Sequence, residues 1–73
     1  MDPYENLANA IIIRAAEDYR KALRRCEQDP EKKAYIKEKE SLERFFRSGW
    51  FGTLTGIDPE LLIRKLREEV GTI

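Results

Sequence analysis

Three Asp-Pro dipeptides divide this chain: Asp2-Pro3, Asp29-Pro30 and Asp58-Pro59. Proline fits the first turn of a helix, because the backbone N–H that it lacks would have no partner there. Aspartate is a favoured N-cap, since its carboxylate accepts backbone N–H bonds at the positive end of the helix dipole. Each dipeptide therefore predicts the start of a helix.

Apolar residues recur at steps of three and four after these dipeptides, which is the spacing of one helix face. The second segment carries its apolar residues at its two ends, around a charged middle. Gly49, Gly52 and Gly56 then limit the next element to a short helix. Strand-like alternation is not found, so the sequence predicts an all-α fold of three main helices plus one short aromatic helix. The chain forms one domain, residues 1–73, with helices at about 3–27, 30–47, 49–54 and 59–70.

The last helix is expected to end at Gly71, a natural C-terminal stop. Its inward row is predicted to be Leu62, Leu66 and Val70, with Leu61 and Ile63 on the flanks of that row.

A chain of 73 residues has a small core, and such a core rarely supplies more than about 3–5 kcal/mol. The single cysteine cannot form an internal disulfide, and the absence of histidine removes the usual zinc ligands. We therefore expect no metal and no cofactor. Self-association is the stabilising device that remains.

The first helix also favours self-association. About 25 residues make a helix roughly 38 Å long, whereas a compact globule of this length has a diameter near 29 Å, from a radius of gyration of about 11 Å. The helix should overhang its domain, and a second subunit would cover the overhang. The sequence thus predicts a homo-oligomer whose interface includes Leu7, Ile11, Ile12 and Ile13.

The charge balance excludes several classes of partner. Fourteen basic and 14 acidic side chains give a formal net charge of zero, which offers no general attraction to nucleic acid or to an anionic membrane. A signal peptide and an apolar run of about 20 residues are also lacking. We expect a cytoplasmic protein with no membrane partner.

Catalysis has little support in the residue types present. Without histidine, proton transfer near neutral pH would need a carboxylate, lysine or cysteine with a shifted pKa. Cys26 falls on the apolar stripe of the first helix, which favours a packing thiol over a reactive one. The glycines match neither phosphate-binding fingerprint. The sequence therefore predicts no enzyme and no catalytic residue.

Aromatic residues cluster at Phe45-Phe46-Arg47-Ser48-Gly49-Trp50-Phe51. One interpretation places these rings in the core between the first and last helices. The other leaves some rings exposed beside arginine, where they would stack bases or anchor a protein partner. Arg20 and Arg24 share a basic flank of the first helix, which is either a solvated face or a phosphate-binding patch. The candidate residues for binding a ligand or partner are Arg20, Arg24, Arg44, Arg47 and Trp50.

A helix-turn-helix is an alternative interpretation of the C-terminal half. Residues 55–58 would be its turn and residues 59–69 its recognition helix. Glu60, Glu68 and Glu69 argue against it, because they place acids where phosphates would lie. DNA is therefore a less favoured partner.

The pattern Phe45-Phe46-Arg47-Ser48-x-Trp50-Phe51 resembles a group of short helical proteins from prophages of Gram-positive bacteria. The segments Leu7-Ala8-Asn9-Ala10-Ile11 and Leu62-Ile63-x-x-Leu66-Arg67 are similar to it as well. The resemblance implies a phage accessory protein that acts in the bacterial host cytoplasm, and it carries no catalytic residues. We interpret the chain as a non-enzymatic binder that interferes with a host system, an anti-defence role in which it captures a host protein or a small anionic signalling nucleotide. The alternative is a DNA-binding or transcription-regulating module.

Overall fold

The computed structural model describes the backbone of residues 3–71 and the side chains of residues 6–71, and all regular structure in that range is helical. Four helices follow one another along the described chain: α1 (Pro3–Gln28), α2 (Lys33–Phe46), α3 (Gly49–Leu54) and α4 (Pro59–Val70). The all-α prediction is confirmed for these residues, and α3 and α4 have the predicted bounds. No helix between residues 3 and 71 has both the length and the apolar character that crossing a membrane requires.

α2 begins later than the Asp29-Pro30 dipeptide predicts. Its N-cap is Lys32, which makes no side-chain capping bond. The backbone N–H of Lys32 donates to the carbonyl oxygen of Asp29 at 3.2 Å, so residues 29–32 form a turn. Aspartate and proline at the first two positions favour a β-turn as well as a helix start. The predicted start at residue 30 is wrong because the chain uses this dipeptide to reverse direction.

The third dipeptide does start a helix. The Asp58 carboxylate accepts a hydrogen bond from the backbone N–H of Glu60 at 3.0 Å, and Pro59 occupies the first turn of α4. Gly71 ends α4 with a φ of 85°, a left-handed conformation that favours glycine. The predicted start and stop of α4 are thus confirmed, and α1 begins at Pro3 as predicted, whereas its predicted N-cap, Asp2, lies outside the described residues.

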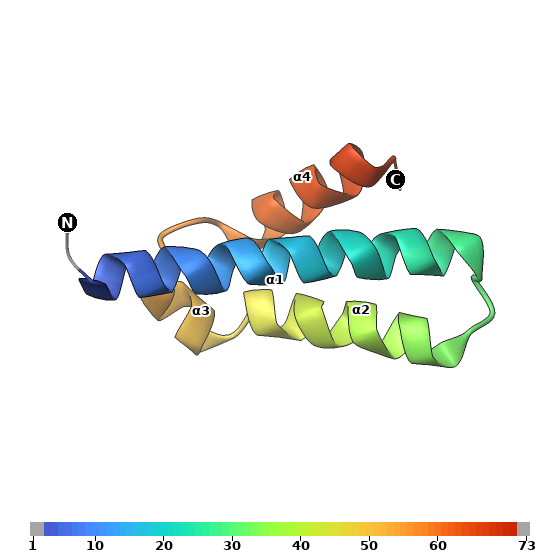
Figure 1. Ribbon diagram of the computed structural model, residues 1–73, viewed down its shortest axis with the longest axis horizontal. Coiled ribbons are helices and arrows are strands. Elements are labelled where there is room, and N and C mark those ends of the chain that lie inside the picture. The colour runs from blue at the N-terminus through green and yellow to red at the C-terminus, as the bar shows by residue number, and fades with distance from the viewer. Residues whose placement is uncertain (1–2, 72–73) are drawn as a thin grey trace.

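α1 runs along the whole length of the molecule, with α2 antiparallel beside it and α3 near the N-terminal end of α1 (Figure 1). α4 contacts both α1 and α2, so it fills the groove on one side of that pair. The molecule measures 43 × 21 × 19 Å and has a radius of gyration of 12.9 Å. A compact globule of this length would have a radius of gyration of about 11 Å, so α1 makes the molecule elongated, as the sequence predicts.

The core lies where α1, α2, α3 and α4 meet. Its largest fully buried side chains are Tyr19, Leu23, Phe46 and Phe51. Tyr19 and Phe51 both contact Phe46 edge to face, at ring-centroid distances of 5.5 Å and 5.4 Å. The smaller core residues and those of α4 are Ala15, Ala16, Ala22, Ile63 and Leu66.

The inward face of α4 differs in part from the predicted row. Leu66 is buried as expected, but the second buried residue is Ile63, which the sequence assigns to the flank. Leu62 and Val70 are partly buried against the core. Because α4 packs on two helices at once, its buried face is centred between the rows that each neighbour would cover alone.

Candidate functional site

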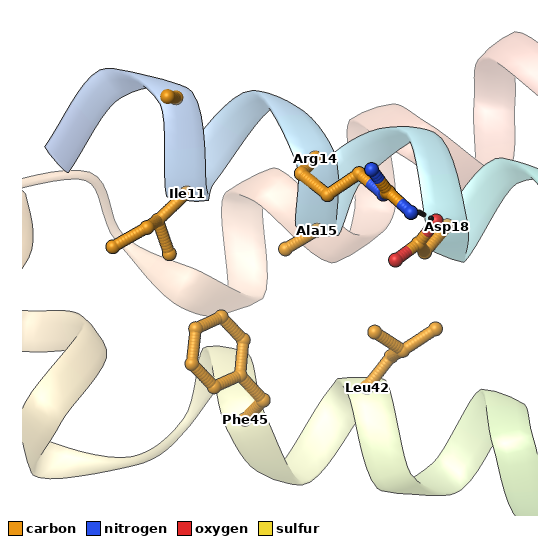
Figure 2. Close-up of a pocket in the computed structure, with 7 residues that line it drawn as sticks. Ile11, Arg14, Ala15, Asp18, Leu42 and Phe45 are labelled. Carbon is orange, nitrogen blue, oxygen red and sulfur yellow. Dashed lines mark ion pairs between the residues drawn. The ribbon is translucent and has the colours of Figure 1, made fainter. Parts of the chain in front are cut away.

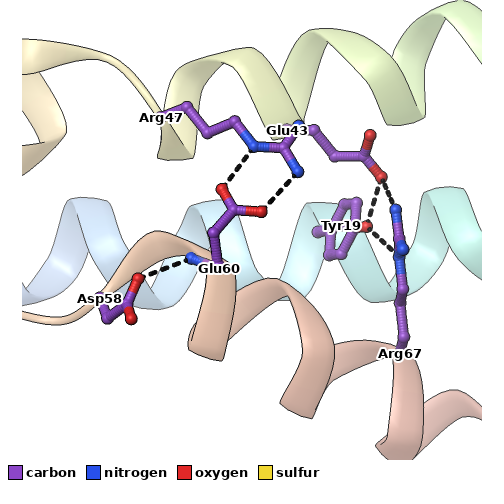
Figure 3. Close-up of polar contacts among 6 residues, drawn as sticks. All are labelled: Tyr19, Glu43, Arg47, Asp58, Glu60 and Arg67. Carbon is purple, nitrogen blue, oxygen red and sulfur yellow. Dashed lines mark hydrogen bonds and ion pairs between the residues drawn. The ribbon is translucent and has the colours of Figure 1, made fainter.

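A polar triad of Tyr19, Glu43 and Arg67 joins α1, α2 and α4 at the point where α4 packs on the other two helices. Tyr19 on α1 donates its hydroxyl proton to the Glu43 carboxylate on α2 at 2.6 Å. Arg67 on α4 donates to the same Glu43 oxygen at 2.7 Å and to the Tyr19 hydroxyl at 3.2 Å (Figure 3). Tyr19 and Glu43 are buried, and the Arg67 side chain is 40% exposed. Each polar group therefore has a partner at the point where α4 docks.

These contacts shift the pKa values of the triad in opposite directions. Burial, helped by the hydrogen bond to Glu43, raises the pKa of Tyr19 to about 12. Burial alone would raise the pKa of Glu43, but the hydrogen bonds from Tyr19 and Arg67 outweigh it and lower that pKa. The hydrogen bond to Glu43 also raises the pKa of Arg67. A protonated tyrosine beside an ionised pair offers neither a nucleophile nor a base near neutral pH, so the triad serves to hold α4.

Two of the predicted ligand residues are engaged by carboxylates within the chain. Arg47 makes two hydrogen bonds to Glu60, at 2.7 Å and 2.9 Å. The bond to Glu60 raises the pKa of Arg47, and the same pair lowers the pKa of Glu60. Arg20 donates to Glu69 at 2.7 Å. Both pairs tie α4 to the neighbouring helices, so an anionic ligand would have to compete with an internal carboxylate.

The other predicted ligand residues lie apart on the surface. Arg24 is exposed on α1, and Arg44 is exposed on α2. Trp50 is the second residue of α3 and is 56% exposed, with its ring 5.5 Å from that of Phe45. The aromatic cluster therefore divides: Phe46 and Phe51 belong to the core, whereas Trp50 is exposed.

The four predicted interface residues of α1 point in different directions. Leu7 and Ile13 are exposed, at 59% and 57%, and Ile11 is half-buried. Ile12 is also half-buried, but it packs against the core of its own chain. Leu7 and Ile11 remain together on one face, where each lines an open groove.

The larger groove lies between α1 and α2 on the side that α4 does not cover, and we call it the α1–α2 groove. Its volume is about 370 Å³. Ile11 and Ala15 face Phe45 and Leu42 across it, and Arg14 pairs with Asp18 on its α1 edge at 3.4 Å (Figure 2). The described residues that line it are Ala10, Ile11, Arg14, Ala15, Asp18, Leu42 and Phe45. It is apolar except for this single ion pair.

A smaller groove, which we call the Trp50 groove, adjoins the first at Ile11. Its volume is about 100 Å³, and it is lined by Leu7, Ala8, Ile11, Trp50 and Leu54. The capping of α3 fixes the Trp50 side of this groove. The Ser48 hydroxyl accepts from the backbone N–H of Phe51 at 3.2 Å and donates to the carbonyl oxygen of Phe45 at 2.7 Å. These bonds anchor the turn from which Trp50 projects.

The described residues do not assemble a site for metal binding or for thiol chemistry. Among the side chains described, those of residues 6–71, no group of three or more Cys, Asp or Glu could hold a metal ion. Cys26 is a half-buried free thiol. The arrangement as a whole offers apolar recesses for binding.

Sequence reasoning missed the triad and most of the α1–α2 groove. A signal for the triad was present: Glu43 and Phe46 are three residues apart and so share a helix face, which places a carboxylate among buried rings. No such signal marked Leu42 as a groove residue, because its exposure depends on where α4 docks. The predicted Leu7, Ile11 and Trp50 do meet around one recess.

Comparison with known proteins adds no relative: the chain matches no protein-family model, no curated protein and no solved structure. The resemblance to prophage proteins therefore stays a prediction.

Proposed function

We propose that this chain is a non-catalytic binding protein that engages another protein through the Trp50 groove. The observation that carries the proposal is that Leu7 and Trp50, 59% and 56% exposed, line the same recess. Large apolar side chains exposed side by side mark interaction surfaces. Tryptophan is also enriched among the residues that dominate binding energy. An apolar side chain from a partner would cover both residues at once.

A protein partner fits these contacts better than a small anionic nucleotide. Arg20 and Arg47, the cations expected to hold phosphate, are already paired with Glu69 and Glu60. Among the described residues that line the two grooves, Arg14 is the one cation, and it lies beside Asp18. Such a lining offers apolar contact without the bidentate cationic contacts that phosphate requires.

The resemblance to prophage proteins supports a host protein as that partner. In this proposal the chain acts in the bacterial cytoplasm and interferes with a host defence system by occupying one of its proteins. The DNA-binding alternative has less support, because the exposed residues of α4 mix Arg64 and Lys65 with Glu60 and Glu68.

Two matched pairs of variants test the proposal. Trp50→Ala and Leu7→Asp alter the groove, whereas Leu61→Ala and Ile57→Asp make the same kinds of change at apolar residues that are 42% and 44% exposed and line neither groove. Each tagged protein is incubated with bacterial lysate, and bound proteins and nucleotides are quantified by mass spectrometry. The enriched protein is then purified, and its affinity for each variant is measured by calorimetry.

We expect the groove variants to bind that protein at least tenfold more weakly, and the control variants to bind it like the wild type. Equal affinity for all four variants would overturn the proposal. Enrichment of a nucleotide that Arg47→Ala abolishes would favour nucleotide capture instead, and enrichment of DNA would favour the DNA-binding alternative.

A further inference from the structure

The α1–α2 pair has two grooves, and α4 fills only one of them. On the filled side, Ile63 and Leu66 of α4 are almost fully buried. On the open side, Ile11, Leu42 and Phe45 remain half-buried along the α1–α2 groove. Ala10 and Ala15 also line this groove, and such small side chains let a helix approach closely. The open side therefore presents an apolar surface, with small side chains at Ala10 and Ala15, against which another helix can pack.

We propose that a second copy of this chain covers the α1–α2 groove in a two-fold symmetric dimer. The groove has two charged lining residues, Arg14 and Asp18, which lie one helical turn apart and have opposite signs. A two-fold axis at the level between them sets Arg14 of each copy against Asp18 of the other. A symmetric interface must be complementary to itself, and this pair meets that requirement within an otherwise apolar lining.

The surface area of the chain agrees with a missing subunit. The accessible surface is 5271 Å², whereas a compact monomer of 8.6 kDa would expose about 4,700 Å². The difference comes from the elongated shape, which leaves surface along α1 that a second copy can bury. The long α1 explains this shape, whose longest extent of 43 Å is about twice the other two.

The dimer goes beyond the proposed function and leaves the Trp50 groove, apart from the shared Ile11, to another partner. Leu7 lies nine residues before the level of the axis, hence about 14 Å away along α1. Trp50, on α3, lies at that same end of α1. A copy that crosses α1 at residues 14–18 would thus add a second Trp50 groove to the assembly.

Charge reversal with mixing tests the symmetric pairing. Arg14→Asp places two acids on this edge of each subunit, and Asp18→Arg places two cations there. The internal Arg14–Asp18 pair is exposed, so its loss should cost little stability. Each variant alone should dissociate at least tenfold more readily, because like charges would meet across the axis. Their equimolar mixture should regain the dimer, since acids would then meet cations at both positions.

A steric variant gives an independent test of the same surface. Ala10→Trp should block the groove, whereas the control Asn9→Trp alters an exposed neighbour that does not line it. Mass is measured by sedimentation velocity at 10–100 µM (about the range in which weak dimers form), and helicity by circular dichroism. We expect twice the 8.6 kDa chain mass for the wild type and Asn9→Trp, and the single mass for Ala10→Trp.

A wild-type protein that sediments as an 8.6 kDa monomer would overturn the dimer. So would a mixture of the two charge variants that stays as dissociated as each variant alone, or a dimer that Ala10→Trp leaves intact. Trp50→Ala and Leu61→Ala should both remain dimeric. If partner binding fails while this dimer persists, the proposed function is wrong and the dimer stands.

Discussion

The two grooves of the α1–α2 pair differ in their charged and apolar side chains, although the same two helices form both. The groove under α4 contains Tyr19 and the charged Glu43, and Arg67 reaches both from α4. The open α1–α2 groove is almost entirely apolar, yet its largest side chains stay half-buried. A covered groove can hold a charge because every polar group there has a partner, whereas an uncovered one keeps apolar surface that another molecule can still bury.

The triad also helps to fix where α4 lies. Removing two charges from water is costly, so such a pair adds less stability than its short distances suggest. Its value here is geometric. Glu43 and Tyr19 both find a donor in Arg67 only at one position of α4 along the pair. On the open side of the pair, Arg14 and Asp18 are the charged residues described that could fix the position of a partner.

The largest expected effect separates the buried from the open side of the aromatic cluster. Phe46→Ala removes a side chain that is 1% exposed, and such changes cost about 3–5 kcal/mol. That matches the whole stability expected of so small a core, about 3–5 kcal/mol. We expect Phe46→Ala to lose most of its helicity in circular dichroism at 25 °C. Trp50→Ala, at a residue 56% exposed, should keep the wild-type spectrum.

A Phe46→Ala protein as helical as the wild type would contradict the packing of the core around this ring. Unfolding of Trp50→Ala would show instead that the Trp50 groove belongs to the core, and it would remove the contrast between the two sides.

The second prediction uses pH to weaken the filled groove alone. The pKa of Tyr19 is raised from 10.0 to about 12 in the folded chain. A raised folded pKa gives stability that is complete below pH 10 and is lost as pH rises through 12. The wild type should lose about 2 kcal/mol of unfolding free energy between these values relative to Tyr19→Phe, which cannot titrate there. Urea unfolding of both proteins at each pH measures the difference.

In the acid range, the dependence of stability on pH has the opposite sign, because it is set by Glu43. Its folded pKa is lowered, so its contribution is present above its ordinary value of 4.5 and is lost as pH falls through the folded pKa. Glu43→Gln should make the stability depend less on pH in this acid range.

Parallel curves of stability against pH for the wild type and Tyr19→Phe across the alkaline range would contradict the buried triad.

Local patterns in the sequence predicted the helices, and docking decided the rest. Apolar spacing and the Asp58 cap depend on neighbouring residues, so the sequence alone could predict them. The same dipeptide at Asp29-Pro30 fits both a turn and a helix start, and only the packing of α2 on α1 selects the turn. The burial of Ile63 and the partial exposure of Leu42 follow from the angle at which α4 docks. No local sequence pattern predicts that angle.

The smallest predicted effect compares two Asp-Pro dipeptides and concerns the start of the helix that fills the groove. Asp58→Ala removes the carboxylate that accepts from the backbone N–H of Glu60, and loss of an N-cap costs about 1 kcal/mol. For a domain of this size that corresponds to a melting temperature about 4–8 °C lower. Asp29→Ala removes no helix cap, so we expect a change within about 0.5 kcal/mol. Thermal unfolding must be compared at one protein concentration, because a dimer stabilises itself by mass action. Equal losses for both variants would mean that Asp29 also supports a helix start, and that the contrast between turn and cap is wrong.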